Sequence, residues 1–153
     1  MQWTCAFAGS PKRLINVGLS VVLVALLGCT APEGNRKMQI EVDVFSGRPN
    51  PHWQLTEQES NEFVQRFQSL PPSSGEGTLK EGLGYRGLIV SVPGKEIEGF
   101  QEIVISNGLV VARQDNQPQK FVDKNRVLEK WLFQTGKGRL DNQLYRQISG
   151  SIE

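Results

Sequence analysis

The chain divides at an apolar run that ends in a cysteine. Lys12 and Arg13 precede the mostly apolar residues 14–27, and Gly28-Cys29 follows directly. A run of this length matches the apolar core of a secretory signal peptide, about 7–15 residues, and falls short of the ~20 residues that span a bilayer as a helix. We therefore expect an export signal, so that only the residues after it have to fold as a domain.

The sequence Leu26-Leu27-Gly28-Cys29 resembles the lipobox of bacterial lipoproteins, in which a small residue precedes a cysteine that receives lipid. The resemblance implies that residues 1–28 are removed and that acyl chains on Cys29 anchor the protein in a bacterial cell envelope. In enteric-type bacteria Asp after this cysteine resembles an inner-membrane retention signal. Thr30 at that position therefore favours the outer membrane. A plain membrane anchor and an ordinary cleaved signal are the alternatives.

Composition limits what residues 29–153 can be. They suffice for one domain. Loss of Lys12 and Arg13 from the 17 basic residues leaves 15 beside 16 acidic ones, which lacks the basic excess that nucleic-acid binding needs. Of the two cysteines, Cys5 is discarded and Cys29 is lipidated, so we expect a domain without thiol or disulfide chemistry.

The first part of this region combines a polar tether with a strand and a helix. Residues 29–37 form the tether, and the single domain covers 38–153. Strict alternation over 38–45 predicts a half-buried strand. Thr56-Glu57-Gln58-Glu59 fits a capping box that opens a helix, which ends at Pro71-Pro72.

The second part predicts further strands and helices. A loop over 71–87 leads to a short β-rich run at 88–92. Asn107-Gly108 between 100–106 and 109–113 is typical of a two-residue type I′ hairpin. The remaining elements expected are a turn at 115–118, a helix capped by Asp123 and ended by a left-handed Gly136, and a short helix near 140–148.

This order of elements predicts an α+β fold. We expect a small two-layer domain with a mainly antiparallel sheet of about four strands and two to three helices, because each element has one apolar face to bury. Trp131 is expected in its core, since it shares helical spacing with apolar neighbours.

The most unusual stretch is Ser46-Gly47-Arg48-Pro49-Asn50-Pro51-His52-Trp53. Its two prolines restrict the backbone, and such rigidity lowers the entropy cost of binding. One interpretation is a recognition loop, joined in space by 85–86 into a cationic and aromatic patch for a carboxylate, sugar or peptide. The other is a stiff connector whose Trp53 fills the core. The residues of the possible binding site are Arg48, Asn50, His52, Trp53, Tyr85 and Arg86.

The Ser-Gly-Arg-Pro-Asn-Pro-x-Trp-x-Leu stretch at 46–55, together with Leu-Gly-Tyr-Arg-Gly at 83–87, resembles a pattern in a group of bacterial proteins. No established activity is attached to that group. The resemblance therefore implies no catalytic residue.

Gly82, Gly84 and Gly87 match the spacing G-x-G-x-x-G of dinucleotide-binding loops. That function requires a strand before the loop and a helix after it. Here a loop precedes and a β-like run follows, and a nicotinamide cofactor is not expected outside the cytoplasm. We expect no cofactor, and glycines that supply positive φ values.

Catalytic and metal-binding groups are sparse. His52 is the only histidine, and without a thiol it has no partner for a Cys-His device, nor enough ligands for zinc. Glu41 and Asp43 lie on one face of the first predicted strand, where they either bind Ca²⁺, act as paired carboxylates or simply face water. The alternation itself favours the last.

We therefore expect a lipid-anchored, non-enzymatic binding or assembly module for another envelope protein, peptide or glycan. Two alternatives remain. The first is a small envelope hydrolase that uses Glu41 and Asp43, and the second is an inhibitor that inserts the 46–53 loop into a partner.

Overall fold

The computed structural model describes residues 37–75, 77–91, 97–114 and 117–152. Every described residue belongs to one compact unit of the chain, Glu33–Glu153. The predicted signal peptide, Cys29 and all but the last residue of the tether lie outside the described residues. No helix in the described ranges is long and apolar enough to cross a membrane.

Six strands and three α-helices make up the described chain. They are β1 (Gln39–Asp43), β2 (His52–Gln54), α1 (Glu57–Gln68), β3 (Gly87–Ser91), β4 (Glu102–Ser106), β5 (Leu109–Gln114), β6 (Gln117–Val122), a 3-10 turn η1 (Lys124–Arg126), α2 (Val127–Thr135) and α3 (Asn142–Ile152).

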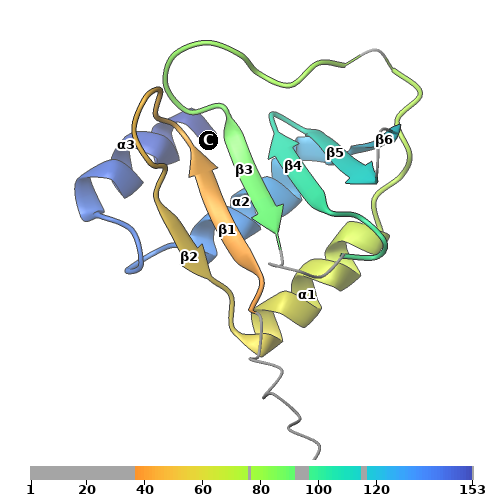
Figure 1. The fold of residues 1–153 in the computed structure, drawn as a ribbon, viewed down its shortest axis with the longest axis horizontal. Coiled ribbons are helices and arrows are strands. Elements are labelled where there is room, and N and C mark those ends of the chain that lie inside the picture. Colours follow the sequence, from red (N-terminus) through yellow and green to blue (C-terminus); the bar gives the residue numbers. More distant parts are fainter. Residues whose placement is uncertain (1–36, 76, 92–96, 115–116, 153) are drawn as a thin grey trace, which may run out of the picture. The chain divides into compact units, whose positions relative to one another are not determined.

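All six strands belong to one sheet in the order β2-β1-β3-β4-β5-β6, and each neighbouring pair is antiparallel. Figure 1 shows α2 and α3 behind this sheet. The predicted α+β class is therefore confirmed, with one antiparallel sheet and three helices.

The predicted strand number was too low, because β2 and β6 were not expected. β2 has only three residues, and two of them belong to the 46–53 stretch that was interpreted as a recognition loop or a stiff connector. β6 begins where a turn was predicted, carries Pro118 and has little buried surface. Both are the outermost strands of the sheet, and the outer side of β6 meets only an isolated bridge between Pro72 and Phe121, so neither needs a long apolar pattern.

The core lies between the helices and one face of the sheet. The predicted alternation in β1 is confirmed, since Ile40 and Val42 are fully buried while their neighbours are partly exposed. The strand register places the buried residues of adjacent strands side by side on this face. These are Leu88, Val90, Ile103, Ile105, Val110 and Ala112.

The first helix begins as its sequence predicts. The Glu59 N–H donates to Thr56 Oγ1 at 3.2 Å, and the Thr56 N–H donates to Glu59 Oε2 at 2.7 Å, which completes the capping box. Phe63 and Phe67 are buried from this helix, and α1 packs against α2.

The hairpin between β4 and β5 also follows the prediction. Asn107 and Gly108 have φ values of 50° and 82°, and Ser106 pairs with Leu109 around them. Positive φ at both central residues is the requirement of a type I′ turn.

Asp123 caps α2 from a buried position. Its two carboxylate oxygens accept the N–H groups of Leu128 and Glu129, each at 2.9 Å. Trp131 is only partly buried on this helix, with the Arg66 guanidinium 4.8 Å above its ring.

Gly136 has a different role from the predicted left-handed cap. Its φ is −76°, and the left-handed glycine is Gly138, with φ 77°. A Cβ atom on Gly136 would lie 3.1 Å from both Leu140 Cδ1 and Trp53 Cη2. The glycine therefore provides space for close packing rather than a backbone conformation.

A substitution at Gly87 tests the packing at the start of β3. An added Cβ would lie 2.6 Å from the Ile105 carbonyl oxygen, so we expect Gly87→Ala to cost about 1–3 kcal/mol of stability. Gly150 lies in α3 with nothing near its Cβ position, and Gly150→Ala is the matched control, expected to stabilise by about 0.5–1 kcal/mol. Thermal unfolding followed by circular dichroism measures both, and an unchanged midpoint for Gly87→Ala would contradict the packing argument.

Candidate functional site

The two unusual sequence motifs meet at one end of the sheet. The residues 45–50 follow β1, and the residues 82–86 precede β3, its neighbour. We call these two segments together the motif corner. The antiparallel pairing of β1 with β3 brings the end of one strand beside the start of the other, which joins segments more than thirty residues apart in the chain.

Asn50 closes the first of these segments. Its Oδ1 accepts the N–H groups of Val44 and Phe45 at 3.2 and 2.8 Å, and its Nδ2 donates to Glu41 Oε1 at 3.0 Å and Asp43 Oδ1 at 3.3 Å. The amide therefore uses both its oxygen and its nitrogen inside the protein. Asn50 shapes the loop rather than presenting a free group to a ligand.

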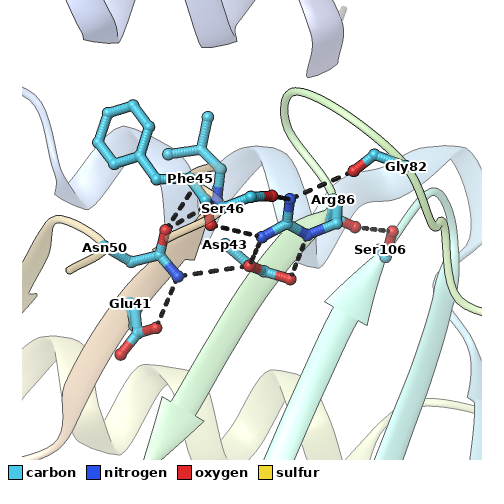
Figure 2. Close-up of polar contacts among 9 residues, drawn as sticks. Glu41, Asp43, Phe45, Ser46, Asn50, Gly82, Arg86 and Ser106 are labelled. Carbon is cyan, nitrogen blue, oxygen red and sulfur yellow. Dashed lines mark hydrogen bonds and ion pairs between the residues drawn. The ribbon is translucent and has the colours of Figure 1, made fainter. Parts of the chain in front are cut away.

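Arg86 joins the two segments (Figure 2). Its Nε donates to Asp43 Oδ2 at 2.9 Å, and its Nη2 donates to Asp43 Oδ1 and, at 2.9 Å, to the Phe45 carbonyl oxygen. Its Nη1 reaches Ser46 Oγ at 3.5 Å and the Gly82 carbonyl oxygen at 3.3 Å. A planar guanidinium suits this task because its donors form a rigid fork.

The backbone around Arg86 strengthens the junction. Its N–H donates to the Asp43 carbonyl oxygen at 2.8 Å, and its own carbonyl oxygen accepts the hydroxyl of Ser106, a buried residue of β4. Residues of β1 and β4 thus hold Arg86, which directly precedes β3.

Tyr85 points into the protein instead. It is buried, and its hydroxyl donates to Glu129 Oε1 at 2.7 Å. Glu129 is fully buried in α2 and accepts from Arg126 Nε at 2.9 Å and from Nη2 at 3.1 Å. Burial and the Glu129 carboxylate raise the pKa of Tyr85 well above its usual range. The tyrosine therefore stays a neutral donor that attaches the second motif to α2.

The remaining residues of the predicted site separate into buried and exposed ones. Trp53 is buried and donates from Nε1 to Thr135 Oγ1 at 2.9 Å, as the connector interpretation expects. His52 is exposed on the edge strand β2, opposite Glu41. Arg48 is exposed at the motif corner. The structure thus brings Arg48, Asn50 and Arg86 together, whereas it places the rings of Trp53 and Tyr85 in the core.

Arg48 has an aromatic support that the sequence analysis missed. The Arg48 guanidinium carbon lies 3.4 Å from the centre of the Phe45 ring, a cation–π contact. Within the described chain no hydrogen bond engages this guanidinium. The two residues are three apart in a loop, so no periodic pattern could have indicated the pairing.

Leu83 is the second feature that the sequence analysis missed. Its side chain is 91% exposed at the tip of the second segment. The flanking Gly82 and Gly84 have φ values of 107° and 85°, a region that favours glycine. The sequence did carry a signal for this exposure, because Leu83 is an apolar residue between two glycines and lies outside any periodic run.

The glycine spacing at 82–87 does not produce a dinucleotide-binding geometry. A loop precedes it and β3 follows it, so no helix begins at these glycines. The helix N-terminus that would face a pyrophosphate is therefore missing at this segment of the described chain.

The two candidate catalytic carboxylates serve as internal acceptors. Both oxygens of Asp43 are bound by Arg86, and the amide of Asn50 also joins Asp43 to Glu41 (Figure 2). Over the described residues, no three His, Cys, Asp or Glu side chains gather in a way that could hold a metal ion. These contacts favour a scaffolding role for Glu41 and Asp43.

Comparisons of the chain with protein-family models, with curated proteins and with solved structures found no match.

The Arg86 junction can be tested against Arg113, an arginine in β5 of the sheet. Arg86→Ala removes the link between the two segments, so we expect a clear fall in melting temperature and faster proteolysis at 45–50. Arg113 forms an exposed ion pair with Glu102, and Arg113→Ala is the matched control, expected to cost less than about 1 kcal/mol. Calorimetry and limited proteolysis compare the two, and equal effects would mean that the corner does not depend on Arg86.

Proposed function

We propose that the protein is a membrane-tethered envelope lipoprotein and that its domain is a non-enzymatic binding or assembly module. The motif corner is its binding surface. The observation that carries this proposal is that the corner has two kinds of polar and apolar side chains. Asn50, Asp43 and Arg86 hold the two segments together through hydrogen bonds. Arg48 and Leu83 are exposed to solvent.

The fixed backbone of the motif corner lowers the entropy cost of binding. Hydrogen bonds fix the backbone on both sides of Arg48 and join the segment of Leu83 to it through Arg86. A surface held in one conformation loses less freedom when a partner docks. The exposed side chains would cost the fold little if they were removed, so a role outside the fold explains their position.

The membrane location rests on the lipobox-like sequence at 26–29, with the outer membrane favoured by Thr30. Acylation of Cys29 would place residues 30–37 between the membrane and β1. β1 starts at Gln39, two residues after Lys37, and ends at Asp43, two residues before the motif corner. Five residues of strand span about 17 Å, so the tether enters the sheet at the opposite end from the corner.

The hydrolase that was considered from the sequence receives less support. A pair of catalytic carboxylates needs one group free to transfer a proton and the other free to attack or to activate water. Asp43 is bound through both oxygens by a guanidinium, and Glu41 shares the amide of Asn50.

Lipidation predicts a specific labelling pattern. When the full chain is expressed in a Gram-negative bacterium with an alkyne-bearing fatty acid, we expect label on the processed protein. Cys29→Ala should abolish the label and leave the precursor uncut, because the thiol is the acylation site. Cys5→Ala is the matched control and should label normally. Label retained in Cys29→Ala would contradict the anchor.

Binding at the corner predicts that a complex depends on Arg48. Formaldehyde crosslinking of cells that express the full chain should give a discrete complex with an envelope protein, and Arg48→Ala should reduce it several-fold. Arg146 is exposed on α3, and Arg146→Ala should leave the complex unchanged.

The crosslinked complex, measured together with the rescue of a deletion strain, separates binding from hydrolysis. We expect Glu41→Gln to leave the complex and the envelope phenotype of a deletion strain unaffected. If Glu41→Gln failed to rescue that phenotype while Arg48→Ala rescued it fully, the hydrolase would replace the binding module.

A further inference from the structure

We propose that the ligand of the motif corner is a carboxylate-bearing peptide segment of a partner protein, whose carboxylate is bound by Arg48 and whose neighbouring apolar side chain packs on Leu83. This inference rests on the proposed function, since it names the ligand class of that surface.

The position of Arg48 selects for a planar anion. The Phe45 ring supports the guanidinium at 3.4 Å and is itself partly buried against the core. The ring lies against one face of the guanidinium, and the exposed side chain keeps its N–H groups available to bind a carboxylate through two hydrogen bonds. Because the ring limits the movement of the side chain, part of the ordering cost is met before binding.

Leu83 supplies the apolar contact beside this anion site. Arg86 Nη1 donates both to Ser46 Oγ in the first segment and to the Gly82 carbonyl oxygen in the second, so the segments that carry Arg48 and Leu83 are held side by side. An exposed leucine gains contact area only when a partner covers it. A peptide offers both groups at once, because an acidic residue and an aliphatic residue lie a few ångströms apart along a chain.

A glycan fits this surface less well. Sugars are typically recognised by stacking on the flat face of an exposed aromatic ring. The rings of Trp53 and Tyr85 are buried, and the ring of Phe45 is covered by Arg48. The motif corner therefore presents no open aromatic face.

An anionic membrane also fits less well. Lipid surfaces attract clusters of several basic side chains. The motif corner has two basic side chains, and Arg86 is already paired with Asp43. The corner also lies at the end of β1 opposite to Lys37.

Site-specific photocrosslinking tests this inference in living cells. The full chain carries p-benzoylphenylalanine in place of Leu83, and the adduct is mapped by mass spectrometry. We expect a protein adduct within a segment that holds an Asp, a Glu or a terminal carboxylate. Arg48→Glu should reduce its yield about tenfold, and a charge reversal of the mapped acid in the partner should restore the yield with Arg48→Glu.

Two controls keep the result specific. Arg146→Glu makes the same charge change on exposed α3 and should leave the yield unchanged, and the photoreactive residue at Gln143 of α3 should give no such adduct. Normal protease resistance of the Arg48→Glu protein shows that it folds.

The possible failures are distinguishable. A protein adduct that Arg48→Glu does not change, or that maps far from any carboxylate, overturns the peptide-carboxylate inference but leaves the binding module intact. Adducts with lipid or glycan only, or no adduct at all from position 83, overturn the inference together with the motif corner as a protein-binding surface.

Discussion

The architecture of the motif corner depends on the contact between Arg86 and Asp43. Glu41 and Asp43 lie on the same face of β1, two residues apart. Without a cation beside Asp43, their like charges would repel each other. Arg86 neutralises Asp43 and also holds Phe45, Ser46 and Gly82. One side chain thus fixes the conformation of two loops that come from distant parts of the sequence.

The neighbouring tyrosine extends this anchorage through the core. Tyr85 and Arg86 are adjacent, so their side chains leave the chain on opposite sides. Tyr85 reaches buried Glu129 at the start of α2, and Arg126, which binds Glu129, also donates from Nη1 to the Ser151 carbonyl oxygen at 3.1 Å near the end of α3. A buried carboxylate is stable only when it is paired and hydrogen-bonded, and here both conditions are met. The motif corner is therefore connected to the sheet and to two helices.

Most polar residues of the two motifs bind other parts of the protein, so their presence in the sequence does not by itself indicate a catalytic function. Residues that look chemically capable in the sequence, such as Glu41, Asp43 and Asn50, are acceptors and donors for one another. What faces solvent is an arginine on a phenylalanine and a leucine between two glycines. A reaction at carboxylates needs groups that are free to exchange protons, and Glu41 and Asp43 are engaged in internal hydrogen bonds instead.

The sequence by itself determined the elements whose signals are local. The capping box at Thr56, the Asn107-Gly108 turn and the alternation in β1 follow from interactions between residues close in the chain, and each was predicted and found. The tertiary structure alone decided the edge strands β2 and β6, since their pairing depends on neighbours that periodicity does not reveal. It also decided the site. Whether Tyr85 or Arg86 faces outward, and whether Asp43 is a free acid or an anchor, depends on contacts across about forty residues of sequence. Local patterns are set by backbone geometry, but the role of a polar side chain is set by the partner that folding brings to it.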